Sequence, residues 1–452
     1  MKSINPTNGE LLKEYAEYST IEVEDIINEV DKTWHIWKNT TFSYRKNLML
    51  NAANVLREHK TEFAITMSLE MGKPLSESLA EIEKSAWVCG YYAQEAENIL
   101  ADELIASDAS KSFVSFEPIG IVLAVMPWNF PFWQVFRFAA PALMAGNAAV
   151  LKHASNVQGC AADIEKVFQL AGFSPNLFRN LVVKSNQVEK IIKNPKIKAC
   201  TLTGSEYAGS QVAMISGKQI KKLVLELGGA DAFIILKDAD IDKAAKVAVQ
   251  ARMLNNGQSC IAAKRFIIDE TILTDFISLV NKELDSLKIG NPLEKGIQVG
   301  PLARADLREE IHAQVDQTLK QGATLIRGGK FIEEKGYFYE PTIIGNLKPG
   351  MKLYSEESFG PVFSIFTFKN EEEAIQLAND SEFGLGGSLW TKDLVKAEKL
   401  ARQIESGGIF INGLTKSDPR LPFGGIKKSG YGRELSHYGI KEFVNIKTIW
   451  IA

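Results

Sequence analysis

The chain has 452 residues, of which 45% are hydrophobic and 24% are charged, and its formal net charge is −3. This length allows two or three domains around a large core, and the weak charge excludes the strongly basic composition typical of nucleic-acid-binding proteins. The four cysteines, Cys89, Cys160, Cys200 and Cys260, are widely spaced, which argues against a disulfide framework and against a metal site of the structural-zinc kind.

Neither a leader sequence nor a membrane span is expected. The first residues lack the apolar core of a signal peptide. The most apolar stretch, residues 121–151, is interrupted by three prolines and by Arg137, whereas a membrane span needs about 20 mostly apolar residues. Together with the unpaired cysteines, this predicts a cytoplasmic protein in a reducing compartment.

The first hundred residues have the pattern of helices. A tract over residues 19–37 begins with Ser19 and Thr20, which are suited to cap a helix. A second helical tract covers about residues 44–57, and further helical sequence continues to about residue 100.

Beyond residue 100, short β-branched runs alternate with helical stretches, which is typical of a mainly parallel α/β sheet. Strands are predicted at residues 120–126, 147–152, 197–204, 222–227, 231–236, 264–269, 361–368 and 407–413. Helices are predicted at residues 305–322, where Leu307, Ile311, Val315 and Leu319 share one face, and at residues 371–380. Two α/β units are therefore expected to meet near residues 226–231.

The last stretch, residues 441–452, has the pattern of a strand with an exposed edge. An unpaired edge invites association with another chain unless something covers it. A partner subunit is one such cover.

One cysteine lies in a setting that suits chemistry. The stretch NNGQSCIAAKRF, Asn255–Phe266, puts Cys260 between a polar turn and an apolar run. A free cysteine more often fills space in a core than reacts, so this stretch alone leaves both interpretations open. Glu226 ends an apolar strand, and enough chain separates it from Cys260 for the two to converge at one sheet edge. A cysteine beside a carboxylate suits covalent catalysis followed by attack of an activated water.

Other polar residues also follow predicted strands. Asn129 lies between prolines and aromatic residues, and an amide aimed at a developing oxyanion is typically worth about 3 kcal/mol. Gly204 and Ser205 begin a helix, and a helix N-terminus binds anions. Singly, each feature has an ordinary structural explanation: Asn129 ties down a loop, Glu226 satisfies a turn, and Glu357 with Phe359 belongs to a loop.

Seven motifs occur in one order over about 300 residues: PWNF, LKHAS, TGS, ELGG, GQSC, EESFGPV and PFGG. Together they resemble the NAD(P)-dependent aldehyde dehydrogenase superfamily over nearly the whole chain. The resemblance implies an α/β fold with a Rossmann-like cofactor domain (residues 1–105 and 120–228) and an α/β catalytic domain (229–425). It also implies a small β oligomerisation element (106–119 and 426–452), in which a strand near residues 106–119 pairs with the C-terminal strand, and a homodimer or homotetramer.

The resemblance also implies catalytic roles. Cys260 as thiolate attacks the aldehyde carbon, and the Asn129 amide with the Cys260 backbone N–H holds the oxyanion. Glu226 activates the water that hydrolyses the resulting Cys260 thioester.

By the same resemblance, the cofactor is bound by Trp128, Lys152, Ser155, Gly204, Ser205, Glu226, Leu227, Glu357 and Phe359. Many members have a glutamate three residues after the lysine, where this chain has Ser155. A carboxylate there repels a 2′-phosphate, whereas a small hydroxyl leaves room for it, and Lys152 adds positive charge. We therefore expect NADP as the preferred cofactor, with NAD possible.

The aldehyde is expected to carry a carboxylate. Arg137 and Ser417 match positions at which succinate-semialdehyde dehydrogenases bind the substrate carboxylate, and an arginine fork suits that group. A second arginine often found six residues before the catalytic cysteine is replaced by Leu254. Several stretches, GGIKKSGYGRELSHYGIKEF among them, closely resemble a short bacterial subgroup of these enzymes, which favours succinate semialdehyde.

Three alternatives remain open from the sequence. The chain could be a cofactor-independent thiol hydrolase that uses Cys260 and Glu226, or a non-catalytic binding protein on the same fold. Within the family, it could oxidise another semialdehyde, such as glutarate semialdehyde, or a plain aliphatic aldehyde.

Overall fold

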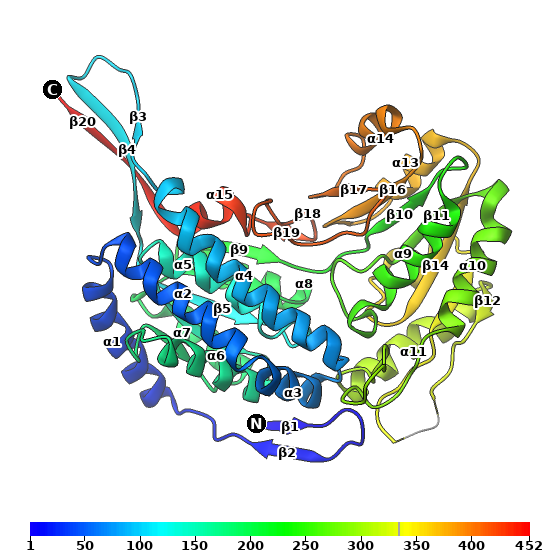
Figure 1. The fold of residues 1–452 in the computed structure, drawn as a ribbon, viewed down its shortest axis with the longest axis horizontal. Coiled ribbons are helices and arrows are strands. Elements are labelled where there is room, and N and C mark those ends of the chain that lie inside the picture. Colours follow the sequence, from blue (N-terminus) through cyan, green and yellow to red (C-terminus); the bar gives the residue numbers. More distant parts are fainter. Residues whose placement is uncertain (333–334) are drawn as a thin grey trace.

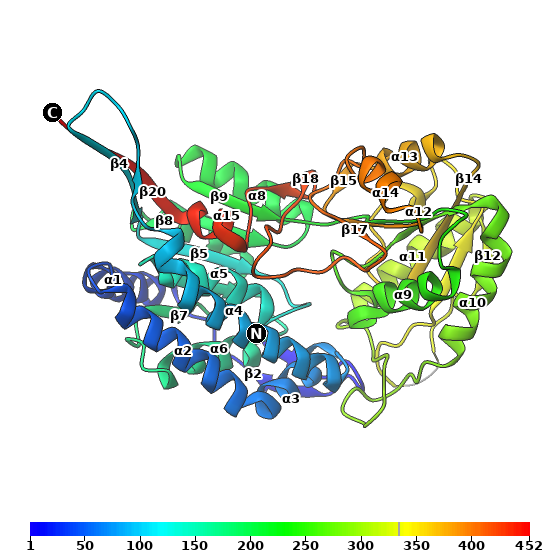
Figure 2. The same cartoon turned by 45° about the horizontal axis from the view of Figure 1, so that its top comes forward.

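The computed structural model describes residues 1–332 and 335–452. Two α/β lobes lie side by side, and a narrow sheet that contains the C-terminus projects from one of them (Figure 1). Turning the molecule shows the chain crossing between the lobes more than once (Figure 2). Each lobe is built around its own mainly parallel sheet.

The N-terminal segment differs from its predicted helical pattern, because residues 2–14 form an antiparallel hairpin of β1 (Lys2–Ile4) and β2 (Leu11–Glu14). The Asn5 side chain accepts a hydrogen bond from the Thr7 N–H, and Gly9 has a φ of +76°. Such local bonds and a left-handed glycine favour a turn over a helix.

Helices then follow as predicted. They are α1 (Thr20–Trp37), α2 (Phe42–Glu58), α3 (Lys60–Met71) and α4 (Leu75–Ile99). Ser19 caps α1 in a reciprocal arrangement with Glu22, which satisfies two backbone donors at the helix start.

A six-stranded sheet forms the first lobe, in the order β19-β9-β8-β5-β6-β7. Its strands are β5 (Ile121–Met126), β6 (Ala148–His153), β7 (Phe178–Asn180), β8 (Ile197–Thr203), β9 (Lys222–Glu226) and β19 (Gly430–Tyr431). The connecting helices are α5 (Trp133–Met144), α6 (Gln158–Leu170), η1 (Ser185–Gln187), α7 (Val188–Lys193) and α8 (Glu206–Lys218). The chain runs outward from β5 on one side and returns through β8 on the other, so the strand order reverses between these two strands. Such a point is where open α/β sheets bind ligands.

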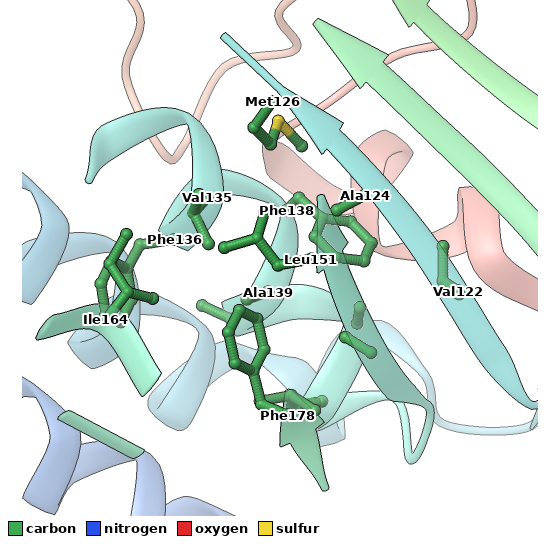
Figure 3. Close-up of a cluster of buried hydrophobic side chains, with 14 of the residues drawn as sticks. Val122, Ala124, Met126, Val135, Phe136, Phe138, Ala139, Leu151, Ile164 and Phe178 are labelled. Carbon is green, nitrogen blue, oxygen red and sulfur yellow. The ribbon is translucent and has the colours of Figure 1, made fainter. Parts of the chain in front are cut away.

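The core of this lobe lies between the sheet and its helices. Side chains of β5 and β6 meet those of α5 and α6, and Phe136, Phe138 and Phe178 fill the space between them (Figure 3). Phe136 and Phe178 are at most 2% exposed, so the apolar stretch is buried in protein as predicted. Among the described residues, no helix is both long and apolar enough to cross a membrane.

A seven-stranded sheet forms the second lobe, in the order β12-β13-β14-β11-β10-β16-β17. Its strands are β10 (Ala232–Ile235), β11 (Arg265–Asp269), β12 (Thr324–Arg327), β13 (Thr342–Gly345), β14 (Val362–Phe368), β16 (Gly387–Trp390) and β17 (Ile409–Ile411). Its helical segments are α9 (Ile241–Met253), η2 (Leu254–Gly257), η3 (Glu270–Ile272), α10 (Leu273–Asp285), α11 (Ala305–Lys320), α12 (Lys352–Ser355), α13 (Glu371–Asn379) and α14 (Leu394–Ala401). Strand β9 ends at Glu226 and β10 begins at Ala232, so the two units meet where the sequence predicts.

The third sheet contains β20 (Val444–Ile451), β4 (Lys111–Pro118) and β3 (Glu103–Leu104), in that order. The predicted pairing of the C-terminal strand with a strand near residues 106–119 is present and runs from Val444 opposite Pro118 to Ile451 opposite Lys111. Strand β20 is the edge of this sheet, and Ile446 and Trp450 on it are 60% and 53% exposed.

The remaining elements join the lobes. Strand β18 (Ile426–Lys427) pairs with β15 (Phe383–Gly384), and β19 pairs with β9. Helix α15 (Ser436–Ile440) and η4 (Lys441–Phe443) lead into β20. The start of the predicted oligomerisation element, residues 426–431, thus pairs with strands outside the third sheet, and the three domain boundaries stay a proposal.

Candidate active site

Two cavities meet between the lobes, and Cys260 lines both. The larger has a volume of about 640 Å³ and lies at the carboxyl ends of β5 and β8, where the strand order reverses. The smaller, of about 190 Å³, lies between α4, α5 and the loop after β17. A thiol in the shared wall is accessible from both sides.

The larger cavity collects most of the residues that the sequence predicts for a cofactor. They are Trp128, Gly204, Ser205, Leu227, Glu357 and Phe359, and the predicted catalytic residues Asn129 and Cys260 line the same cavity. Ser205 caps α8, so the N-terminus of that helix faces the cavity. Trp128 and Phe359 meet edge to face with their ring centroids 5.8 Å apart.

The turn before Cys260 is held in an uncommon backbone conformation. Asn255, Asn256 and Gly257 all have positive φ, at 54°, 58° and 80°, and asparagine and glycine tolerate this region best. The Asn256 amide bonds to the carbonyls of Gly72 and Pro301, each at 3.0 Å. The polar NNG sequence therefore fixes the position of Cys260.

Two buried cations that the sequence analysis missed complete this support. Arg252 donates to the carbonyls of Gly257 and Ser358. Lys264 donates to the Cys260 carbonyl at 2.7 Å and pairs with Glu357 at 3.1 Å. Both belong to apolar stretches, where a buried Arg or Lys usually has specific partners. A cation within an apolar stretch is the sequence pattern that points to Arg252 and Lys264 as buried residues.

Cys260 is half-buried, whereas the other three cysteines are fully buried and unpaired, as expected for core residues. Burial raises the pKa of the Cys260 thiol to about 12, against a smaller lowering effect of Lys264 and Arg137. The resting thiol is therefore protonated near neutral pH, and its reaction requires loss of that proton.

Asn129 lies directly beside the cysteine turn. Its side-chain N–H donates to the Gln258 carbonyl at 3.1 Å, and its side-chain oxygen accepts from Gln134 at 3.1 Å. This orientation leaves one amide proton, and the residue lines the same cavity as Cys260. The predicted oxyanion donor and the predicted nucleophile are thus brought together.

Glu226 is placed differently from the other predicted catalytic residues. It is 2% exposed, it lines neither cavity, and neither carboxylate oxygen has a hydrogen-bond partner among the described residues. Burial and then the neighbouring Glu434 raise the pKa of its carboxyl well above the usual range, whereas Arg137 lowers it. The next residue along the chain, Leu227, does line the larger cavity.

Lys152 and Ser155 lie at the same sheet edge but outside the larger cavity. Lys152 lies near the end of β6, the strand next to β5, and Ser155 follows that strand, so both are one strand further from Cys260 than Trp128 and Asn129. Ser155 is exposed, and Lys152 is half-buried with a pKa lowered by that burial.

The smaller cavity contains both residues predicted to hold a substrate carboxylate, Arg137 and Ser417. It also contains Leu254, which occupies the position of the missing arginine, and Lys84 of α4, which the sequence analysis did not single out. A lysine on an amphipathic helix is usually solvated, so the sequence offers no signal for it.

Arg137 already has an anionic partner. Its guanidinium pairs with Glu434, stacks on Phe423 at 4.6 Å from the ring centroid, and donates to Thr203 at 3.3 Å. Arg137 and Glu434 are 3% and 5% exposed. The guanidinium thus contributes charge to the cavity wall while it compensates a buried carboxylate.

We expect Arg137→Met to destabilise the protein and to lower activity toward every aldehyde. The variant leaves Glu434 without its cation, and breaking a buried ion pair from one side costs about 3–5 kcal/mol. Because burial raises the pKa of Glu434, the folded variant holds a proton that the unfolded chain releases, so its stability falls further as pH rises. Denaturant unfolding at pH 5 and pH 8 measures this, and an undiminished stability at pH 8 would contradict it.

The larger cavity brings together the Cys260 thiol, the oriented Asn129 amide and the N-terminus of α8. The smaller cavity lies on the other side of the thiol and has a mostly apolar wall that contains Arg137 and Lys84. This arrangement suits attack of the thiol on an electrophilic carbon, with an anionic cofactor bound on one side and an anionic substrate on the other. Among the described residues, no group of His, Cys, Asp and Glu is arranged to hold a metal ion.

Comparison with known proteins extends this picture. A model of the aldehyde dehydrogenase family matches residues 1–449. A probable NADP-dependent succinate-semialdehyde dehydrogenase of Synechocystis is 50% identical over 450 residues, which cover 100% of this chain and 99% of that protein. An NADP-dependent succinate-semialdehyde dehydrogenase of Mycobacterium avium is 47% identical, with 99% and 96% covered. The crystal structure of succinic semialdehyde dehydrogenase from Streptococcus pyogenes with NADP+ is 37% identical with a TM-score of 0.98 and covers 100% of this chain and 99% of that one.

Proposed function

The chain belongs to the aldehyde dehydrogenase family, and from that premise we propose that it oxidises succinate semialdehyde to succinate with NADP and, less well, with NAD. The observation that carries this proposal is the position of Cys260 in the wall shared by a large cavity and a small cationic one. The full-length relatives named for this substrate and cofactor support it.

The larger cavity fits a dinucleotide. It lies at the reversal of strand order, its mouth includes the N-terminus of α8, and Gly228 lies so close to Glu357 that a Cβ there would be 2.4 Å from a carboxylate oxygen. Ser205 and the α8 N-terminus would hold the pyrophosphate, Glu357 a ribose hydroxyl, and Lys152 with Ser155 the adenosine ribose and its 2′-phosphate. When bound there, NADP supplies a hydride acceptor next to Cys260.

Cys260 forms the covalent bond. Its thiolate sulfur attacks the aldehyde carbon, the carbonyl π bond opens, and the charge moves to the oxygen, which the Asn129 amide and the Cys260 backbone N–H stabilise. After the carbon has given up its hydride, a thioester remains on Cys260. Asn129 is already oriented by Gln134 and Gln258, so no reorganisation is needed for this role.

Glu226 completes the cycle by accepting a proton from the water that attacks the thioester, which yields succinate and the free thiol. This role requires the side chain to rotate from its buried position toward the cavity that Leu227 lines. Within residues 1–332 and 335–452, neither carboxylate oxygen makes a hydrogen bond that would resist such a rotation.

We expect Ser155→Glu to shift the cofactor preference toward NAD. Glutamate at this exposed position brings a negative charge to the proposed 2′-phosphate site, and juxtaposed like charges weaken binding by roughly 10- to 100-fold. The ratio of kcat/KM for NADP to that for NAD measures the effect. An unchanged ratio would mean that residue 155 does not select the cofactor.

The function itself is tested by the absorbance of NADPH formed by the purified protein from succinate semialdehyde, in comparison with butanal and with NAD in place of NADP. A strong preference for succinate semialdehyde with NADP supports the proposal. Equal rates with butanal would contradict succinate semialdehyde as the specific substrate. Hydrolysis of an ester, with no NADPH formed from any aldehyde, would favour the thiol hydrolase.

We further propose that the protein is a cytoplasmic homodimer or homotetramer. Exposed apolar side chains on the edge strand β20, such as Ile446 and Trp450, support association with another copy.

A further inference from the structure

We propose that Lys84 on α4, together with Ser417, is the anchor for the substrate carboxylate. The proposal rests on the function proposed above and names which groups of the smaller cavity recognise a semialdehyde. It assigns this role to a residue outside every motif and leaves Arg137 as a structural partner of Glu434.

Lys84 is oriented into the smaller cavity by two contacts. Its ammonium lies 4.2 Å from the centroid of the Trp133 ring, and it donates to the Ser417 hydroxyl oxygen at 2.8 Å. All three residues line the cavity that also contains Cys260. Since the Ser417 oxygen accepts from Lys84, its own proton is available, and the pair presents donors suited to a carboxylate.

The ammonium has no carboxylate within ion-pairing distance among the described residues, although acidic groups lie nearby. Glu81 pairs with Lys73 and accepts from two backbone N–H groups, and Asp418 pairs with Arg420. Glu434 pairs with Arg137. Each of these three anions is thus engaged elsewhere, and Glu77 in the same wall accepts from the Asn255 N–H. Lys84 is a half-buried cation of this wall that has no carboxylate partner among the described residues.

The wall around Lys84 strengthens such a pair. Phe130, Trp133, Leu254 and Phe423 make the cavity mostly apolar, and an ion pair gains strength where water is scarce. Leu254 occupies the position, six residues before Cys260, at which related enzymes often have an arginine. In this chain Lys84 of α4 supplies the positive charge that is missing there.

The charged groups that face Lys84 predict a pH dependence. Burial first, and then Arg137 of α5 and Lys416, lower the pKa of Lys84 to about 8, against the raising effect of Glu81 of α4 and Asp418. Deprotonation of Lys84 removes the anchor, so the preference for a carboxylate-bearing aldehyde should decline as pH rises through about 8. Ionisation of Cys260 affects both kinds of aldehyde and cancels in their ratio.

The experiment compares Lys84→Met, Lys84→Arg and Lys46→Met with the wild type, using kcat/KM for succinate semialdehyde and for butanal. Lys46 is an exposed lysine of α2 outside both cavities and serves as the matched control, whose two kcat/KM values should equal those of the wild type. We expect Lys84→Met to lower kcat/KM for succinate semialdehyde by roughly 10- to 100-fold, the range of one charge-assisted hydrogen bond, through KM. Butanal oxidation should be unchanged and reports that the variant is folded, and Lys84→Arg should restore most of the preference.

A wild-type preference that survives Lys84→Met, or an equal loss with both aldehydes, would overturn the role of Lys84 while leaving the proposed function intact. A wild type without any preference for succinate semialdehyde would overturn both. The ratio of the two kcat/KM values should fall above pH 8 in the wild type, and this fall should be absent in Lys84→Met. Burial raises the pKa of Glu77 in the same wall to about 7, so its ionisation affects both proteins alike at lower pH. Parallel profiles above pH 8 for the two proteins would contradict the assignment.

Discussion

Replacement of Cys260 by alanine should abolish NADPH formation, with kcat lowered by more than about 10⁴-fold, as loss of a covalent nucleophile does in other enzymes. The reason is positional, because Cys260 is the cysteine that lines both cavities and the residue that Asn129 and the asparagine-rich turn hold in place. Removal of its sulfur removes the thiol nucleophile from the wall that the two cavities share. Steady-state absorbance with succinate semialdehyde and NADP measures the loss.

The matched control is Cys200→Ala. Cys200 is fully buried in β8 and lines neither cavity, so its variant should retain activity with at most a modest loss of stability. Binding of NADP to Cys260→Ala, followed by fluorescence, should persist and shows that the fold is intact. Residual dehydrogenase activity near the wild-type rate in Cys260→Ala would remove the thiol from the mechanism.

Replacement of Glu226 by glutamine should separate the two halves of the reaction. Acylation of Cys260 proceeds, but hydrolysis of the thioester loses its general base, which typically contributes about 10²- to 10⁴-fold. A rapid burst of NADPH equal to the enzyme concentration should therefore precede a slow steady state. Stopped-flow absorbance resolves the burst.

The same change at Glu309, an exposed residue of α11 outside both cavities, should leave steady-state turnover at the wild-type rate. Absence of a burst in Glu226→Gln, with slow NADPH formation from the first turnover, would mean that Glu226 acts before or during hydride transfer. An unaffected steady state would exclude it as the base.

Much of this architecture is present in the sequence pattern. Alternating strands and helices predict two α/β units that meet near Glu226, and the structure confirms this junction. The family resemblance predicts the pairing of the C-terminal strand with β4. Local turn chemistry at Asn5 and Gly9 overrides the helical prediction for residues 2–14.

The sequence predicts those residues of the site that belong to the family motifs. Trp128, Asn129 and Ser205 follow strands of the first lobe, and the ends of those strands meet at one sheet edge. Cys260 and Glu357 lie in loops that precede β11 and β14 of the second lobe and line the same cavity. The roles assigned to these residues remain proposals. The sequence does not reveal how side chains pair across elements.

Ion pairing in the smaller cavity is the clearest case. Arg137 has the right position for a carboxylate but is held by Glu434, which is far away in the chain. Lys84 belongs to an ordinary amphipathic helix, and only the folded structure shows that it faces Ser417 and Trp133. Such pairings depend on tertiary contacts that no local pattern contains.

The most direct test of the mechanism is the identity of the residue that carries the acyl group. The enzyme is quenched in acid during turnover of succinate semialdehyde with NADP, digested with trypsin, and the peptide of residues 253–264, whose one cysteine is Cys260, is examined by mass spectrometry. A succinyl group on this peptide, dependent on both NADP and the aldehyde and accumulating in Glu226→Gln, is the predicted result. An acyl group on another residue, or none on Cys260 while NADPH is formed, would contradict the Cys260 thioester.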